Sequence, residues 1–275
     1  LEKVLASAAM DNKTVFITSL NKAWIEKDSI FGIFLMSFKY GIDTEWLINH
    51  LVVICFDETA FEYCTDMRTL HCYHFEIEDV DLSDEALFMT PNYLEMMFRR
   101  ILVLTNILEL GYSFLFSDTD IMWLRNPFPH LHPDADFQVA SDHFAGDPFS
   151  PNSAANCGLL YIRSTPATIQ FLKMWYEERE FNPNIHDQDL FGRLKYCPAM
   201  RKIGLRIKYL NTQYFGGICE PSRDMNLVCS MHTNCCVGLE KKKNYLKSVL
   251  EDWKNYLTLP LTIRKSNPPS WSLSQ

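Results

Sequence analysis

Short runs of β-branched and aromatic residues alternate along the chain with longer segments whose apolar residues recur at helical spacing. Residues 14–20 and 50–57 form two such runs, and an apolar segment of helical length, 29–40, lies between them. The clearest helix is predicted from Thr90, a favourable N-cap residue followed by proline, to Gly111, a favourable stop. The pattern therefore predicts strand, helix and strand in succession, as in an α/β protein.

The same alternation continues through the rest of the chain. We predict further strands at 113–118, 136–142, 157–164, 204–210 and 226–232, and helices at 165–179 and 239–256. Strands that alternate with helices form a mostly parallel sheet sandwiched by helices, and ligands bind at the carboxyl ends of its strands. Because no repeat or break in composition divides the chain, we expect one domain over 1–275, with an irregular tail at 260–275.

Composition narrows the range of partners. A chain of 275 residues that is 47% hydrophobic can bury a substantial core, so disorder is not expected. A net charge of −8 argues against nucleic acid as the main partner, because phosphate backbones are bound by basic surfaces. No apolar run approaches the roughly 18 residues that cross a bilayer. Since the sequence starts at Leu1 without methionine, we expect a longer protein in which a signal or membrane anchor precedes this segment.

Nine cysteines are many for a cytosolic protein, and they favour disulfides formed in a secretory compartment over buried free thiols. No pair of Cys-x-x-Cys units is present, which makes metal ligation by cysteine the weaker alternative. Asn12 begins an N-glycosylation sequon, although the sequon runs directly into an apolar stretch. Spacing does not fix the disulfide pairing; we hypothesise Cys64 with Cys72, and Cys219 or Cys229 with Cys235 or Cys236.

The pattern Asp-x-Asp is too short to be specific by itself. It occurs four times, at Asp79/Asp81, Asp118/Asp120, Asp134/Asp136 and Asp187/Asp189. The first and third copies lie in polar segments, where an Asx turn or a cap is the simplest explanation. The fourth opens an amphipathic segment, where aspartate is a common helix N-cap.

The second copy, Asp118 and Asp120, differs because a strand-like run leads directly into it and the apolar residues 121–123 follow. Two carboxylates two residues apart can bind one divalent cation, Mn²⁺ or Mg²⁺, which in turn neutralises a diphosphate. A structural turn that caps the strand is the simpler alternative. A phosphatase with an aspartyl nucleophile is a further one, but it would place the motif near the start of its core, whereas 117 residues precede Asp118.

Several longer segments carry a family resemblance. The strings "SDTDIMWLRNPFP", "NCGLLYI", "HDQD" and "YFGGICEPSRDMNLVCSMHTNCC" resemble the plant nucleotide-diphospho-sugar transferase domain of glycosyltransferase family 77. The resemblance extends over nearly the whole chain and implies a GT-A fold, a Rossmann-like sheet that binds a sugar nucleotide. It also implies a retaining, metal-dependent enzyme held in the Golgi, with its catalytic domain in the lumen, as a single-pass type II membrane protein.

The resemblance also implies roles for individual residues, by position in these motifs. The implied metal ligands are Asp118, Asp120 and His232. The implied donor-binding residues are Thr18, Asn21, Arg100, Asp118, Asp142, Asn156, Gly238 and Lys241, with Lys242 or Lys243 as substitutes for the last. The implied catalytic pair, below the reacting sugar, is Asp187 and Gln188. Considered alone, His232 would be interpreted as a core histidine and Arg100 as a surface residue on a helix flank.

The activity implied by the resemblance is transfer of arabinofuranose, xylose or galactose from a UDP-sugar to a hydroxyl of a cell-wall glycan or glycoprotein. Retention of configuration allows a covalent adduct on Asp187, or front-face attack in which the leaving phosphate takes the acceptor proton. We favour the front-face route. A non-catalytic member that binds a sugar nucleotide or glycan and acts as a scaffold for another transferase is the alternative, and metal-dependent donor turnover distinguishes the two.

Overall fold

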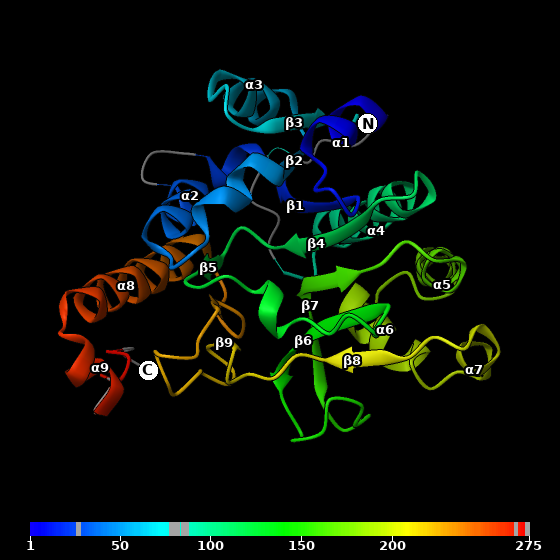
Figure 1. The fold of residues 1–275 in the computed structure, drawn as a ribbon. Coiled ribbons are helices and arrows are strands. Elements are labelled where there is room, and N and C mark those ends of the chain that lie inside the picture. Colours follow the sequence, from blue (N-terminus) through cyan, green and yellow to red (C-terminus); the bar gives the residue numbers. More distant parts are fainter. Residues whose placement is uncertain (26–28, 77–82, 84–87, 267–268, 273–275) are drawn as a thin grey trace.

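The computed structural model describes residues 1–25, 29–76, 83, 88–266 and 269–272. Its centre is a seven-stranded sheet in the order β3-β2-β1-β4-β7-β6-β8 (Figure 1). Strand β7 runs antiparallel to both of its neighbours, β4 and β6, and the other neighbouring pairs are parallel. The mostly parallel sheet predicted from the sequence is therefore confirmed. The strands are β1 Thr14–Leu20, β2 Leu51–Cys55, β3 His71–His74, β4 Ser113–Ser117, β6 Phe137–His143, β7 Ala154–Ile162 and β8 Ile207–Tyr209.

Helices cover both faces of this sheet, which is why its strands are apolar on both sides. Val15 and Ile17 of β1 pack into the core beneath α1, α4 and α5, whereas Phe16 packs against α2 on the other face. The sandwich of helices predicted from the alternating pattern is thus present (Figure 1). The helices are α1 Glu2–Ala8, α2 Ile30–Tyr40, α3 Glu58–Asp66, α4 Pro91–Glu109, α5 Pro166–Glu177, α6 Asp187–Leu194, α7 Pro198–Ile203, α8 Leu239–Thr258 and α9 Leu261–Ser266.

Helix α4 begins and ends where the sequence predicts. The Thr90 side chain accepts a hydrogen bond from the Tyr93 backbone N–H, and Pro91 occupies the first turn. At the other end Gly111 adopts a φ of 82°, a conformation that glycine reaches without strain. This helix carries Arg100 toward the carboxyl end of β4, so its fixed ends matter for the site described below.

A second, three-stranded sheet lies beside the first and has the order β5-β10-β9. Its strands are β5 Ile121–Trp123, β9 Phe215–Gly217 and β10 Ser230–His232. The chain passes from β4 through Asp118, Thr119 and Asp120 into β5, so the acidic pair lies where the two sheets meet. The apolar run that follows the acids in the sequence is therefore a strand of another sheet, packed beneath α2 and α8.

Two disulfides are present, Cys64–Cys72 and Cys219–Cys235, and both agree with the hypothesised pairings. The first ties α3 to β3, and the second joins the segment after β9 to the loop after β10. The free cysteines are Cys55, Cys157, Cys197, Cys229 and Cys236.

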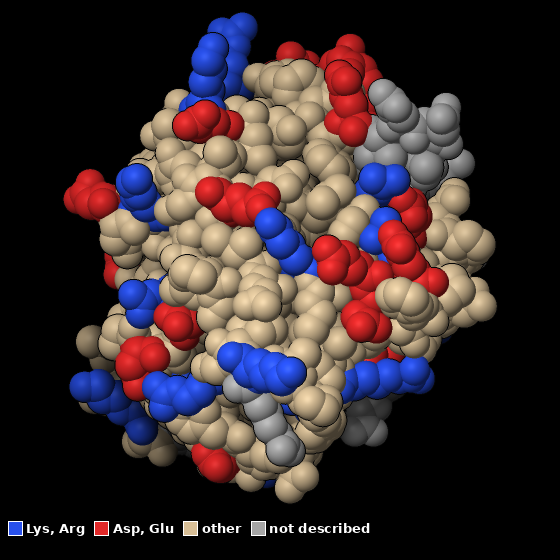
Figure 2. Space-filling view, turned by 90° about the vertical axis from the view of Figure 1, so that its right-hand side faces the viewer, with Lys and Arg blue, Asp and Glu red and all other residues tan. Residues whose placement is uncertain are grey.

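The expected irregular tail at 260–275 needs correction, because residues 261–266 form helix α9. Elements α1, α3, α7, β3 and β9 were not predicted; each is short, so its periodicity is weak. The acidic pair Asp79/Asp81 lies outside the described residues. No described helix is both long enough and apolar enough to traverse a bilayer. Basic and acidic side chains are interspersed on the face shown in Figure 2, where no broad basic patch is visible.

Candidate active site

Asp118 is held from two directions at the carboxyl end of β4. Its backbone N–H donates to the Gly158 carbonyl of β7 at 2.7 Å. Its Oδ1 accepts a hydrogen bond from Nη1 of Arg100 at 2.8 Å. Arg100 is only 4% exposed, so this is a buried ion pair and not the surface arginine that the helix flank alone suggested.

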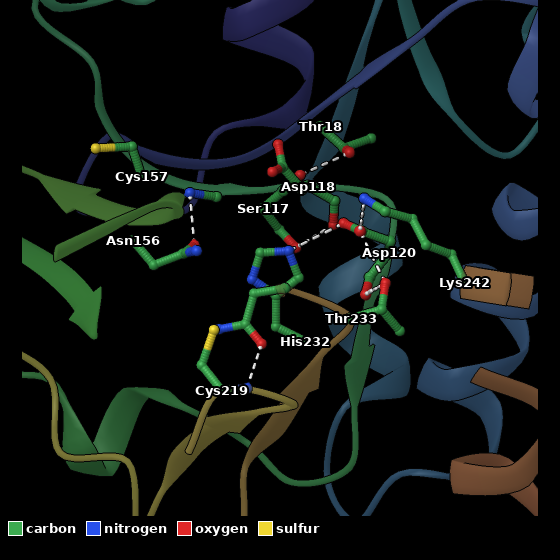
Figure 3. Close-up of polar contacts among 12 residues, drawn as sticks. Thr18, Ser117, Asp118, Asp120, Asn156, Cys157, Cys219, His232, Thr233 and Lys242 are labelled. Carbon is green, nitrogen blue, oxygen red and sulfur yellow. Dashed lines mark hydrogen bonds and ion pairs between the residues drawn. The ribbon is translucent and has the colours of Figure 1, made fainter. Parts of the chain in front are cut away.

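Asp120 is surrounded by three donors from the C-terminal third of the chain (Figure 3). Nζ of Lys242 lies 2.7 Å from its Oδ2, and the Thr233 hydroxyl donates to the same oxygen at 2.8 Å. Nε2 of His232 lies 3.1 Å from Oδ1. These contacts explain how an acid that is 1% exposed is accommodated between two apolar strands.

The three sequence-predicted metal ligands lie together. One donor atom from each of Asp118, Asp120 and His232 can be chosen so that all lie within 4.8 Å of one another. Two carboxylates and an imidazole suit Mn²⁺ and related divalent cations. Residue 158 is a glycine, and its lack of a side chain leaves room between these ligands. A Cβ at this position would lie only 2.6 Å from both Asp118 Oδ2 and His232 Cε1. The donor set and the space beside it therefore fit a divalent cation.

Burial and neighbouring charges affect the two carboxyl groups differently. Burial raises the pKa of Asp118, and the Arg100 guanidinium only partly opposes it. Burial acts on Asp120 in the same direction, but Lys242 and His232 outweigh it and hold the pKa of Asp120 well below its ordinary value. Asp120 is thus ionised at neutral pH, and a cation beside it would favour ionisation of Asp118 as well.

A second polar cluster, here called the amide cluster, consists of Asp142, Asn156, Gln188 and Asn234. Oδ1 of Asp142 accepts hydrogen bonds from Asn156 at 2.9 Å and from Asn234 at 2.7 Å. Gln188 donates to Oδ2 of Asp142 at 3.3 Å and accepts from the Cys157 backbone N–H at 3.0 Å. The cluster adjoins the acids, because Asn156 Oδ1 also lies within 3.0 Å of the Cβ position of Gly158.

Asp187 is fully buried and is linked to Asp118 through Arg100. Its Oδ2 accepts a hydrogen bond from Nη2 of Arg100 at 2.9 Å, and Nε2 of His186 lies 2.9 Å from its Oδ1. Burial would raise the pKa of Asp187, but Arg100 and His186 overcome it and hold this pKa far below its ordinary value. Arg100 therefore bridges Asp187 and Asp118, and Asp187 is the first residue of α6 and not its N-cap.

A cavity opens beside the acids. Its walls come from the loop after β1, the start of α4, the acidic turn and the start of α8. Gly238, the N-cap of α8, has a φ of 95°, and the first turn of this 20-residue helix borders the cavity. Helix N-termini favour anions, and the Lys242 ammonium adds a full positive charge. The lining residues are Ser19, Leu20, Asn21, Trp24, Phe56, Phe88, Tyr93, Met96, Met97, Asp118, Thr119, Asp120, Cys236, Val237, Gly238, Leu239 and Lys242.

Of the remaining residues predicted from the sequence, some line the cavity and others do not line it. Asn21 lines the cavity, whereas Thr18 is buried and its hydroxyl donates to the Ser117 carbonyl at 2.7 Å, which links β1 to β4. Lys241 is exposed, and the structure brings Lys242 to Asp120 in its place. Lys242 lies four residues before the buried Leu246 and thus on the inward side of α8.

Thr233, Asn234 and Gly158 were not predicted as site residues. Thr233 and Asn234 directly follow His232, so a search of the residues after that strand end would have included them. Gly158 is revealed only by its close approach to Asp118 and His232 across the sheet.

Comparison with known proteins identifies a family for this chain. The model of the family described as nucleotide-diphospho-sugar transferase matches residues 46–246. An uncharacterized protein of Arabidopsis thaliana is 44% identical over 262 residues, which cover 95% of this chain and 69% of that protein. A UDP-D-xylose:L-fucose alpha-1,3-D-xylosyltransferase of the same plant is 27% identical over 183 residues, 56% of this chain and 46% of its own.

The fold also has a solved counterpart. The glycosyltransferase GlyE of Streptococcus pneumoniae superposes with a TM-score of 0.51 and 13% identity, over 96% of this chain and 66% of that one. The architecture is the GT-A fold. The chain belongs to the nucleotide-diphospho-sugar transferase family, a family of glycosyltransferases.

Proposed function

We propose that this chain transfers a sugar from a UDP-sugar to a hydroxyl of a glycan or glycoprotein, with a divalent metal and with retention of configuration. The observation that carries the proposal is the convergence of Asp118, Asp120 and His232. The two acids of this triad lie in the wall of a cavity that the N-terminus of α8 also borders. A cation-binding triad beside a helix N-terminus suits a diphosphate, whose charge both would neutralise.

In this proposal the cavity holds the nucleotide. Its inner wall carries Asn21, Trp24 and Phe56, which offer an amide and aromatic surface to a base and ribose. Lys242 and the N–H groups of the first turn of α8 would face the diphosphate. When bound at the triad, Mn²⁺ or Mg²⁺ would act as a Lewis acid toward the leaving diphosphate.

We assign the donor sugar to the amide cluster. Asp142, Asn156 and Gln188 present hydrogen-bonding groups beside the triad, and Asp142 and Gln188 are partly exposed. Such groups recognise sugar hydroxyls by direct hydrogen bonds. The candidate sugars are arabinofuranose, xylose and galactose, and the relatives described as an arabinosyltransferase, a xylosyltransferase and a galactosyltransferase support all three.

The front-face route is supported by the surroundings of Asp187. This carboxylate is 0% exposed and is held by Arg100, so a nucleophilic attack would require it to leave a buried ion pair. We therefore propose that Asp187 positions Arg100, which in turn orients Asp118. The acceptor hydroxyl would attack the anomeric carbon on the face that the diphosphate leaves. Its proton would pass to a phosphate oxygen.

We further propose that the protein works in the lumen of the Golgi, in cell-wall biogenesis, as a membrane-anchored protein. The two disulfides support an oxidising compartment. The xylosyltransferase relative acts on L-fucose, which supports a glycan or glycoprotein as the acceptor.

Thermal unfolding with UDP, with and without Mn²⁺, tests the donor site. A ligand at about a hundred times its dissociation constant adds roughly 2.7 kcal/mol, which should raise the midpoint by about 5 to 10 °C in a chain of this size. Asp120→Asn should abolish the metal-dependent part of the shift. Asp134→Asn is the matched control, because Asp134 belongs to another Asp-x-Asp copy and is exposed.

Turnover is then measured with UDP-arabinofuranose, UDP-xylose and UDP-galactose, and the anomeric configuration of the product is read by NMR. Metal-dependent release of UDP with a retained anomer supports the full proposal. A metal-dependent UDP shift without turnover of any donor would instead favour a scaffold that binds the nucleotide. No shift with UDP or other nucleotides would remove the donor site altogether.

A further inference from the structure

Asn12 lies at the tip of a hydrogen-bonded turn that precedes β1. The Lys13 N–H donates to the Met10 carbonyl at 2.8 Å, and the Met10 N–H donates to the Thr14 carbonyl at 2.8 Å. Oδ1 of Asn12 accepts a hydrogen bond from the Thr14 N–H at 3.0 Å, and Lys13 adopts a φ of 57°. The side chain of Asn12 is exposed, although the strand that follows it is buried.

An open groove of about 440 Å³ begins at this side chain. Asn12 forms part of its wall, and Trp46 and Phe128 face the groove from the 3-10 helices Glu45–His50 and Phe128–His130. The Trp46 and Phe128 rings lie 5.8 Å apart between centroids, and both residues are partly exposed. His50 completes this aromatic wall, 5.6 Å from Trp46.

We propose that Asn12 carries an N-linked glycan whose first N-acetylhexosamine rests in this groove. Asn12-Lys13-Thr14 is the only Asn-x-Ser/Thr sequon in the chain. A pyranose has an apolar C–H face that matches the exposed faces of Trp46 and Phe128. The first sugar is the expected occupant of the groove, because its covalent bond to Asn12 places it at the groove wall.

The modification takes its sugar from a lipid-linked oligosaccharide diphosphate. The Asn12 Nδ2 forms a bond to the anomeric carbon, and the bond from that carbon to the diphosphate oxygen breaks with its electron pair on the departing lipid diphosphate. The proton that Nδ2 loses passes to water. Oδ1 keeps its hydrogen bond to the Thr14 N–H, so the turn is compatible with the product. Because the Thr14 side chain is buried in the folded protein, the glycosylating enzyme recognises its hydroxyl before β1 forms.

The groove is remote from the candidate active site. Asn12 precedes the amino end of β1, whereas the acids follow the carboxyl end of β4, which pairs with β1 in parallel. A glycan at Asn12 therefore leaves the cavity open, and this inference is independent of the proposed transferase activity.

The first test is secretion of the chain from eukaryotic cells, followed by treatment with a glycan-releasing amidase in ¹⁸O-water. Asn12 should be recovered as ¹⁸O-labelled aspartate, and the mass of the intact protein should fall by the mass of the glycan to that of the unmodified chain with this aspartate at position 12. Asn12→Gln should be secreted without the glycan. Because Asn12 is exposed, the variant keeps the fold, which an unchanged circular dichroism spectrum checks. Unlabelled Asn12 in the secreted protein overturns the proposal.

The second test concerns the groove. The protein trimmed to a single N-acetylhexosamine should unfold at a midpoint about 2 to 4 °C above that of the amidase-treated protein. In Trp46→Ala this difference between the two glycoforms should vanish, whatever the effect of the substitution on the fold itself. An equal difference in Trp46→Ala would show that the sugar does not rest on Trp46 and would overturn the groove assignment.

Discussion

Gly158 is the position at which one added methyl group should reveal whether the candidate site is as tight as its geometry indicates. A Cβ there would lie 2.6 Å from Asp118 Oδ2, 2.6 Å from His232 Cε1 and 3.0 Å from Asn156 Oδ1. Ordinary van der Waals contact begins at 3.4 Å, so the first two distances are too short by at least 0.8 Å and the third by at least 0.4 Å. Gly158→Ala therefore forces the acid and the histidine apart or displaces β7.

Neither neighbour is free to move. Asp118 is fixed by the Arg100 guanidinium at 2.8 Å and by its own backbone N–H on the Gly158 carbonyl. His232 ends β10 and lies against Asp120. Overpacking of this kind costs about 1 to 3 kcal/mol, which corresponds to a fall in the unfolding midpoint of roughly 2 to 10 °C. Displaced ligands should also weaken Mn²⁺ binding by about 10- to 100-fold.

The assay combines thermal unfolding without metal and isothermal titration with Mn²⁺ on wild type and Gly158→Ala. Gly192→Ala is the matched control, since Gly192 lies in α6 and a Cβ there meets nothing within 4 Å. That control should gain stability by about 0.5 to 1 kcal/mol, as expected for alanine in place of a helical glycine. If Gly158→Ala keeps both the wild-type midpoint and the wild-type Mn²⁺ affinity, the crowding deduced here is wrong.

Three further outcomes are expected. Lys242→Met should weaken binding of UDP with Mn²⁺ by roughly 10- to 100-fold, because a charged hydrogen-bond donor is lost. Lys241→Met should leave this affinity unchanged, and equal losses of affinity for the two variants in titration calorimetry would contradict the assignment of Lys242 to the diphosphate. Arg100→Met should lower the free energy of unfolding, measured in urea, by about 3 to 5 kcal/mol, because two carboxylates lose their buried partner. A loss below about 1 kcal/mol would argue against a stabilising Arg100 bridge between Asp118 and Asp187. Iodoacetamide should label Cys236, which borders the cavity, well before Cys229, since burial raises the pKa of the Cys229 thiol to about 12; peptide mapping that finds the reverse order would disprove this.

Much of the fold was open to prediction because its signals are local. The caps and periodicity of α4 lie within one segment, and so do the apolar runs that became β1 and β4. The boundaries of short elements were not, because a helix as short as the six-residue α9 contains too little of the helical period to be recognised in the sequence.

The sequence by itself determined which residues were candidates for the site. The position of Asp118 and Asp120 between two apolar runs indicated a strand end that needed a partner for its charges. The resemblance then named His232 as a further metal ligand and Arg100 as a donor-binding residue. These inferences rest on residue type and on neighbours in the chain, which the sequence states directly.

Only the tertiary structure decided which of those residues meet. Arg100 contacts both Asp118 and Asp187, and Asp187 lies 87 positions after Arg100 in the sequence. Lys242, and not Lys241, reaches Asp120, from which it is separated by 122 positions. Such pairings depend on how β4, α6 and α8 pack and on how each helix is rotated about its axis. A one-residue change of position on a helix turns a side chain by about 100°. The contacts between distant segments are therefore fixed by the packing of the whole core, which no local stretch of the sequence specifies.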